Sequence, residues 1–410
     1  MAEYAKFTED MIKTHTILVP DMLPVHFKLL ISIFESKGYK MELLQNDSRA
    51  VVDEGLKNVH NDACYPALLV IGQFMDALNS GKYDPDKTAL LITQTGGGCR
   101  ASNYIHLLRK CLNKSYPQVP VCSLNFSGLE KDSGFKITGG MFLKMLYAIL
   151  YGDLLMTCHN KCRAYELKKG EAAAVLDKWQ KKLGEMFRSG GRKYMKTKKL
   201  YNEILNDFAA IKLSGEKKIR VGIVGEIYVK YSPLANNHLE DFLISEGCEP
   251  VVPSLLEFVM YCAVANFNNA KIYDNASTTS RVFKLGYKLI YRMQKQLIEV
   301  MKKQGSFEPL HDFEHLRKLA DKYINQGVVM GEGWLIPAEM AALAKSGVEN
   351  IICAQPFGCL PNHIVAKGMS RAIKEDNPNA NIVAIDYDPG ATRVNQENRI
   401  KLMLANAKKQ

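Results

Sequence analysis

The sequence predicts an α/β protein of two lobes with parallel sheets and a helical insert, and two observations lead to this fold class. At 410 residues the chain exceeds the size at which one hydrophobic core stops growing. Short apolar runs typical of buried strands alternate with amphipathic segments typical of helices along most of the chain. Hydrophobic residues make up 47% and charged residues 24%, as in ordinary globular proteins, so disorder is not expected.

The first α/β lobe is expected over residues 1–130. Short apolar runs bounded by turn residues predict its four strands at 15–20, 39–44, 89–93 and 120–124. Apolar residues at helical spacing predict helices between these strands, at 25–36, 65–78 and 103–112. Pro66 stands in the first turn of the second helix, where proline is well tolerated.

A helical insert is expected over 131–215, and a second α/β lobe over 216–410. Helical spacing within the insert predicts helices at 141–151, 172–187 and 200–211. A polar linker at 214–218 then leads into the second lobe, whose strands are expected at 219–226, 250–253, 350–353 and 380–386. Its helices are expected at 239–246, 279–303, 313–325 and 396–404, with a helical insertion at about 279–325.

The net charge of +11 raises the question of a nucleic-acid partner. The segment 181–199 is rich in Lys and Arg with Glu185 as its only acid, so it could bind phosphates, including those of a CoA ester, or an acidic protein. The alternative is a solvated helical face around the Gly190-Gly191 break. No helix-turn-helix, zinc-finger or RNA-binding motif accompanies the run, so we expect no nucleic acid.

The sequence also argues against a membrane protein. The first six residues carry an early acid and no apolar core of a signal peptide. The longest apolar stretch, 141–156, is interrupted by Lys144 and by Gly152-Asp153, and it is shorter than the roughly 20 residues of a membrane-spanning helix. We expect a cytoplasmic protein whose ten cysteines are reduced and available for metal or redox chemistry.

Three cysteines, Cys64, Cys99 and Cys359, each lie in a turn built from Gly or Pro. Thiolates on exposed, bent backbone suit an iron–sulfur cluster better than a packed core. Cys99 follows a predicted strand, at the edge where α/β sheets bind ligands. Two of these turns belong to the first lobe and one to the second, so a shared cluster would lie in the cleft between lobes. The alternative is three buried or incidental cysteines, because no compact Cys-x-x-Cys run supports a cluster.

The other cysteines are more ambiguous. Cys353 ends an apolar strand six residues before Cys359, so it is either a fourth cluster ligand or part of the core. Cys158 and Cys162 lie one helical turn apart, which suits zinc or a second cubane, but no partner pair is visible and core packing is favoured. Core packing is also expected of the cysteines in apolar patterns, namely Cys111, Cys122, Cys248 and Cys262.

The cysteine turns resemble the cysteine motifs of the 2-hydroxyacyl-CoA dehydratase superfamily. The matching segments are Asn61-Asp62-Ala63-Cys64-Tyr65-Pro66-Ala67, Thr93-Gln94-Thr95-Gly96-Gly97-Gly98-Cys99-Arg100-Ala101-Ser102-Asn103-Tyr104 and Gln355-Pro356-Phe357-Gly358-Cys359-Leu360-Pro361-Asn362-His363. The likeness is greatest to the dehydratase-like module of acyl-CoA dehydratase activase fusion proteins, which is related to double-cubane cluster proteins. It extends over most of the chain through the segments 163–166, 224–231, 331–334 and 386–392.

The resemblance implies two flavodoxin/Rossmann-like lobes with a cluster in the interdomain cleft, held by Cys64, Cys99 and Cys359. The cofactor would be a [4Fe-4S] cluster or an [8Fe-9S] double cubane. An ATP-hydrolysing iron–sulfur activase of the actin-like ATPase class would supply low-potential electrons. A homodimer, or a heterodimer with a related subunit, is also implied.

For activity, the resemblance implies an ATP-coupled iron–sulfur reductase or an (R)-2-hydroxyacyl-CoA dehydratase-like lyase, acting on a CoA ester or a small reducible substrate. The chain departs from the family, because it shows no recognisable CoA fingerprint and the dehydratases use two different subunits. Two alternatives therefore stay open. The chain is a non-catalytic electron-relay or scaffold subunit of such a complex, or it is an α/β binding protein without a cluster.

Four further side chains are candidates for the chemistry. Glu226 and Glu332 stand at Gly turns, where a carboxylate is able to ligate iron or move protons, although such acids often cap helices. His363 is placed to donate to a cluster sulfide or to cap a helix. Arg100, next to Cys99, would offset thiolate charge.

Overall fold

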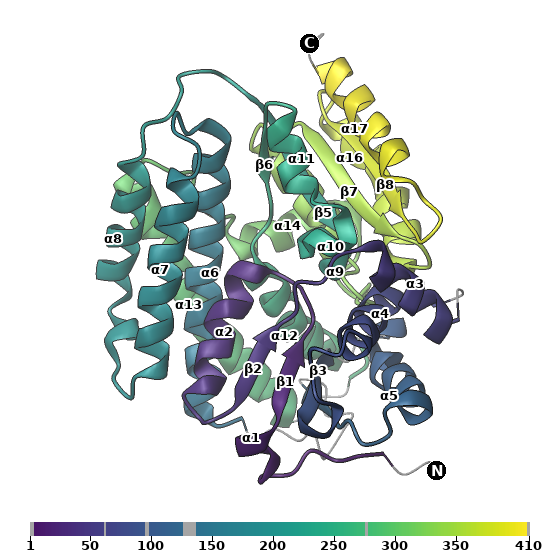
Figure 1. Cartoon of the computed structure of the whole chain (residues 1–410). Helices are drawn as coiled ribbons and strands as arrows, with labels where there is room; N and C mark the ends of the chain where they lie inside the picture. Colours follow the sequence, from purple (N-terminus) through teal and green to yellow (C-terminus); the bar gives the residue numbers. More distant parts are fainter. Residues whose placement is uncertain (1–3, 61–62, 95–97, 126–136, 275–277, 408–410) are drawn as a thin grey trace.

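The chain folds into two four-stranded parallel sheets with helices around them, which confirms the predicted α/β class (Figure 1). This computed structural model describes residues 4–60, 63–94, 98–125, 137–274 and 278–407. Both sheets have the same strand order, in which the first strand of the lobe pairs with the second on one side and the third on the other. The two lobes are therefore similar in topology, as flavodoxin-like or Rossmann-like lobes are.

The first sheet has the order β2-β1-β3-β4, and all its pairs are parallel. Its strands are β1 (Thr16–Val19), β2 (Lys40–Leu43), β3 (Thr88–Gln94) and β4 (Val121–Asn125). Its helices are α1 (Met11–Thr14), α2 (Pro24–Glu35), α3 (Arg49–Asn58), α4 (Tyr65–Asn79) and α5 (Tyr104–Ser115), with short turns η1 (Pro85–Lys87) and η2 (Arg100–Asn103). The side chains of Ile17, Leu18 and Val19 are all inaccessible to solvent. Burial on both faces explains why this strand is a continuous apolar run.

The second sheet has the order β6-β5-β7-β8, and its pairs are also parallel. Its strands are β5 (Ile219–Gly225), β6 (Cys248–Val251), β7 (Asn350–Pro356) and β8 (Asn381–Tyr387). Its helices are α9 (Ile227–Tyr231), α10 (Pro233–Asn236), α11 (Leu239–Ser245), α15 (Leu335–Lys345), η4 (Pro361–Ala366), α16 (Lys367–Asp376) and α17 (Arg393–Ala407). In each sheet the chain changes direction across the sheet at the first strand, so the carboxyl ends of β1 and β3, and of β5 and β7, form crevices.

A layer of long helices forms the third part of the molecule. Its members are α6 (Gly139–Tyr165), α7 (Glu171–Arg188), α8 (Thr197–Ala209), α12 (Leu255–Ile272), α13 (Thr278–Gln304) and α14 (Phe313–Tyr323), with the short turn η3 (Lys193–Met195). Helices α6, α7, α8 and α13 stand along one flank of the molecule (left in Figure 1). The predicted insert at 131–215 and the predicted insertion at 279–325 thus pack together, in one core that includes one face of the first sheet.

Helix α6 is long and apolar enough to cross a membrane by length and composition, but 72% of its most apolar window is buried inside the protein. This burial is what a core helix of a soluble protein shows, and it explains the apolar stretch noted in the sequence. Asp153, the acid within that stretch, is buried, and its carboxylate accepts hydrogen bonds. It accepts from the backbone N–H groups of Leu255 (2.8 Å) and Leu256 (3.1 Å) and lies 2.9 Å from His26 Nε2.

We expect Asp153→Ala to lower the free energy of unfolding by roughly 3 kcal/mol, because it leaves several buried polar groups without partners. Urea unfolding followed by circular dichroism measures the change. Asp177→Ala, at an exposed position of α7, is the matched control and should change stability by less than about 0.5 kcal/mol. Equal stability of the two variants would contradict this role for Asp153.

Candidate functional site

The three turn cysteines lie in the wall of one cavity of about 230 Å³, together with Glu226 and Glu332. The cavity is at the carboxyl ends of β3 and β7, where parallel sheets form ligand crevices. The turns bend as expected, but their thiols are not displayed on the surface. Cys64 and Cys359 are only 6% and 8% exposed, and Cys99 is half-buried. The structure thus brings together residues almost 300 positions apart.

The turns of Cys64 and Cys359 touch through their backbones. The Tyr65 N–H donates a hydrogen bond to the Phe357 carbonyl at 3.1 Å. Gly358 adopts φ +75°, and a Cβ at that position would lie 3.3 Å from the Cys64 Cα and 3.1 Å from a guanidinium nitrogen of Arg100. Glycine at this position therefore allows both the left-handed turn and the close packing of this turn against Cys64. This contact joins the two lobes beside two of the thiols.

Each of the three thiols lies near the start of a helix. Cys64 is the N-cap of α4, Cys99 is the N-cap of η2, which runs directly into α5, and Cys359 precedes η4. The Cys64 sulfur lies 2.6 Å from the Tyr104 hydroxyl, and the Asn362 amide donates to the Cys359 sulfur at 3.1 Å. Helix N-termini and hydrogen-bond donors both favour thiolates over thiols.

Burial has a larger effect on the pKa of the three thiols than these hydrogen-bond donors have. It raises the pKa of the Cys99 thiol to about 11, with the carboxylates of Glu332 and Glu226 adding to the effect. The pKa of Cys359 is raised further by burial and by the same two acids. Burial also raises the pKa of Cys64, while Tyr104 opposes the change. Two buried thiols and one half-buried thiol beside two acids ionise more readily next to a positive charge; Arg100 provides one for Cys64, and a soft metal would provide a stronger one.

Glu226 and Glu332 both accept hydrogen bonds from backbone N–H groups at the start of α9. The Glu226 carboxylate accepts from the Val229 N–H at 2.8 Å and caps α9, and the Glu332 carboxylate accepts from the Ile227 N–H at 2.9 Å. Gly225, before Glu226, adopts φ +128°, and a Cβ there would lie 2.2 Å from the carbonyl oxygen of Ala354 in β7. Glycine is required at this strand end.

The two acids keep a proton in the cavity. Burial, and then the Glu332 carboxylate, raise the pKa of Glu226 to about 8. Burial also raises the pKa of Glu332. Two close carboxyl groups away from water do not ionise together, so one of them holds a proton at neutral pH. The pair is able to give that proton to a bound molecule.

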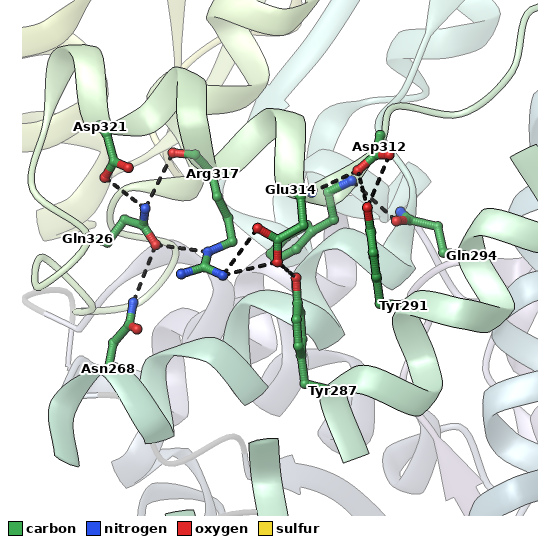
Figure 2. Close-up of polar contacts among 10 residues, drawn as sticks. Asn268, Tyr287, Tyr291, Gln294, Asp312, Glu314, Arg317, Asp321 and Gln326 are labelled. Atoms are coloured by element: carbon green, nitrogen blue, oxygen red, sulfur yellow. Dashed lines mark hydrogen bonds and ion pairs between the residues drawn. The ribbon is translucent and has the colours of Figure 1, made fainter. Parts of the chain in front are cut away.

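A polar network fixes the start of the turn that carries Glu332 (Figure 2). Arg317 of α14 donates to the Gln326 side chain at 3.0 Å and to Glu314 at 3.1 Å. Asn268 of α12 donates to the same Gln326 oxygen at 3.3 Å. Tyrosines from α13 complete the network, with Tyr287 bonded to Glu314 and Tyr291 to Asp312. The helical layer therefore holds the segment that leads to the cavity.

Two sequence candidates lie outside the cavity wall. His363 is exposed, and one of its ring nitrogens lies 2.9 Å from the Gln355 amide nitrogen. Cys353 is buried in the core of the second lobe, where its thiol donates to the side-chain oxygen Oδ1 of Asn362 at 3.4 Å. Since Asn362 also donates to Cys359, its amide stands between these two sulfurs. The structure does not bring Cys353 or His363 to the cavity with the other candidates.

The remaining sequence candidates are placed as follows. Cys158 and Cys162 are fully buried in the core, and the Cys162 thiol donates to the Phe208 carbonyl. Arg100 lies in the cavity wall beside Cys99. The basic run 181–199 lies on α7 and the start of α8, where some of its charges are paired, and it does not line the cavity. The motif residues Asn61, Asp62, Thr95, Gly96 and Gly97 lie outside the described residues.

Among the cavity residues that sequence reasoning missed, Tyr104 and Cys262 matter most for the chemistry. Tyr104 belongs to the Cys99 motif, and its position in the first turn of the following helix is the signal that points to this site. Cys262 was expected to pack in the core, yet it is half-buried in the cavity wall, on α12. No helix was predicted at 255–272, and nothing in the apolar pattern around Cys262 distinguished it from a core cysteine.

Among the described residues, no three His, Cys, Asp or Glu side chains are close enough to hold a single metal ion. In an iron–sulfur cluster the thiolates bind different irons, so they stand further apart than the ligands of one ion. Comparisons of the chain with family models, with curated proteins and with solved structures found no match.

The raised pKa of Glu226 predicts how stability depends on pH. The folded chain keeps a proton that the unfolded chain releases between an ordinary pKa of 4.5 and about 8, so stability should fall as pH rises through this range. In Glu226→Gln the fall should be shallower, because the neutral amide cannot ionise. Urea midpoints measured from pH 5 to 8 test this, with Glu375→Gln, at an exposed acid of α16, as a control that follows the wild type. Parallel curves for wild type and Glu226→Gln would contradict it.

Proposed function

We propose that this chain is a cytoplasmic iron–sulfur protein that receives low-potential electrons from an ATP-dependent activase. It acts as a reductase or as a 2-hydroxyacyl-CoA dehydratase-like component. One observation carries the proposal: three cysteines from two separate lobes line a single cavity. The resemblance of the same three turns to the cysteine motifs of the 2-hydroxyacyl-CoA dehydratase superfamily supports it.

The residues present fit an iron–sulfur cluster. The three turn cysteines and Cys262 offer soft sulfur donors in the cavity wall, and its two acids raise the pKa of the turn thiols, so a cationic partner would favour their thiolate forms. The absence of a side chain at Gly358 keeps the Cys64 and Cys359 turns together, so they act as one cradle. Cys64, Cys99 and Cys359 would hold a [4Fe-4S] cluster or one half of a double cubane. Such a cluster supplies one-electron chemistry at low potential.

The chain's own residues would act around the cluster. The Tyr104 hydroxyl and the Asn362 amide hold the sulfurs of Cys64 and Cys359 in place. Glu226 and Glu332 hold a proton that a reduced substrate would need. A CoA ester or a small reducible molecule would enter the same cavity, and Arg100 offers a positive charge in its wall.

A second candidate function is an electron relay without chemistry of its own. The observation that favours it is the presence of Cys262 in the cavity wall, because a fourth thiol reduces the need for a substrate at the iron. In this form the chain would pass electrons from the activase to a related subunit. Both candidates need the cluster and the activase. They differ in what binds the fourth iron of the cluster, which is a substrate in the first candidate and a cysteine in the second.

Anaerobically purified protein should be brown and carry about four irons per chain with matching sulfide, or about eight for a double cubane. Cys64→Ala, Cys99→Ala and Cys359→Ala should each lose most of the iron. Cys111→Ala, at a buried cysteine of α5 away from the cavity, should keep it. Iron and sulfide analysis measures the result. Wild-type protein that contains no iron after anaerobic purification and reconstitution would refute the proposal.

Reduction by the activase should depend on ATP hydrolysis. A purified iron–sulfur activase of the actin-like ATPase class, reduced with dithionite, should bleach the visible absorbance of the chain when ATP is present. A non-hydrolysable ATP analogue should give at least about tenfold slower bleaching, which corresponds to a barrier higher by about 1.4 kcal/mol. Stopped-flow absorbance measures both rates. Equal rates with ATP and with the analogue would refute an ATP-driven partner.

A further inference from the structure

Cys262 reaches the cavity from the helical layer, whereas the three turn cysteines reach it from the two lobes. It lies on α12, near Tyr261, Ala265 and Asn266, which line the same wall. Cys99, Tyr261 and Cys262 all line this cavity. Four thiols from three parts of the molecule therefore share one cavity.

Helix α12 holds Cys262 firmly in this wall. Asp153 accepts from the first N–H groups of the helix, and further along the Asn268 side chain is tied to Gln326. Between these points the Tyr261 ring packs edge-on against Trp334, with ring centres 5.0 Å apart. A residue held on both sides along a regular helix has a fixed direction. The position of the Cys262 thiol is thus determined by the fold.

Cys262 differs from the core cysteines in being half-buried and in lining the cavity, although the buried thiols of Cys111 and Cys158 also make no hydrogen bond within the described residues. The thiols of Cys162 and Cys353 donate to the Phe208 carbonyl and to Asn362. Within the part of the chain that the structure describes, the Cys262 thiol makes no hydrogen bond. It is also one of few cysteines that are only half-buried. A thiol that faces a cavity without a partner is available as a ligand.

We propose that the Cys262 sulfur is the fourth ligand of a single [4Fe-4S] cluster whose other ligands are Cys64, Cys99 and Cys359. This inference rests on the proposed function, because it presupposes a cluster in the cavity. Coordination removes the thiol proton to solvent, forms one iron–sulfur bond and moves no electron. All four irons are then bound by cysteine, so no iron is open to a substrate. Of the two candidate functions, this arrangement favours the electron relay.

The experiment compares Cys262→Ala with Cys353→Ala, a buried cysteine outside the cavity wall. After anaerobic purification and mild ferricyanide oxidation, wild type and Cys353→Ala should keep about four irons per chain. Cys262→Ala should drop to about three and show the electron paramagnetic resonance signal of a [3Fe-4S] cluster. Iron retention by Cys262→Ala equal to that of the wild type would overturn the inference.

A second measurement needs no variant and so does not depend on Cys262→Ala folding. Cyanide binds an iron that lacks a protein ligand, so it should leave the resonance spectrum of the reduced wild type unchanged. A cyanide-induced change in the wild type would also overturn the inference. The two proposals fail differently. Wild type without iron refutes the proposed function, whereas an iron-loaded wild type that binds cyanide refutes only the fourth ligand.

Discussion

The contact between the turns of Cys64 and Cys359 is the constraint on which the site depends. The hydrogen bond from Tyr65 to Phe357 and the missing side chain at Gly358 bring the N-terminus of α4 against the end of β7. Each turn belongs to a different lobe, so the lobes cannot separate here without opening the cavity. Because the thiols lie directly beside this contact, the geometry of the site follows from the packing of the two sheets' ends.

The cavity carries acidic groups, whereas the chain as a whole has a net positive charge. The chain carries a net charge of +11, yet its cavity joins buried thiols to the carboxyl groups of Glu226 and Glu332. The nearby buried cation Lys230 is already paired with Glu339, at 2.9 Å. A buried region with surplus acids is costly unless protons or a cation neutralise it. This is the physical reason to expect a positively charged group among the thiols.

The sequence predicted the parallel strands well because each is a short apolar run between turn residues, as 219–226 and 380–386 illustrate. It also predicted that Cys64, Cys99 and Cys359 share one site, since two of their turns belong to the first lobe and one to the second, which places a shared site in the cleft between the lobes. It could not show the role of Cys262, because α12 is apolar around most of its surface and gives no periodic signal. Cys353 and His363 are close to Cys359 in sequence, but side-chain direction in the strand and helix turns them away from the cavity.

The walls of the cavity come from residues as far apart as Cys64 and Pro361. During synthesis the turns of Cys64 and Cys99 are made well before the turn of Cys359, and both parts of the helical layer are made between them. A growing or truncated chain therefore offers metal an incomplete and solvent-exposed set of thiols. In the proposed function, cofactor insertion would therefore have to follow the folding of the Cys359 turn against the first lobe, so a loaded cluster would report that both lobes have folded.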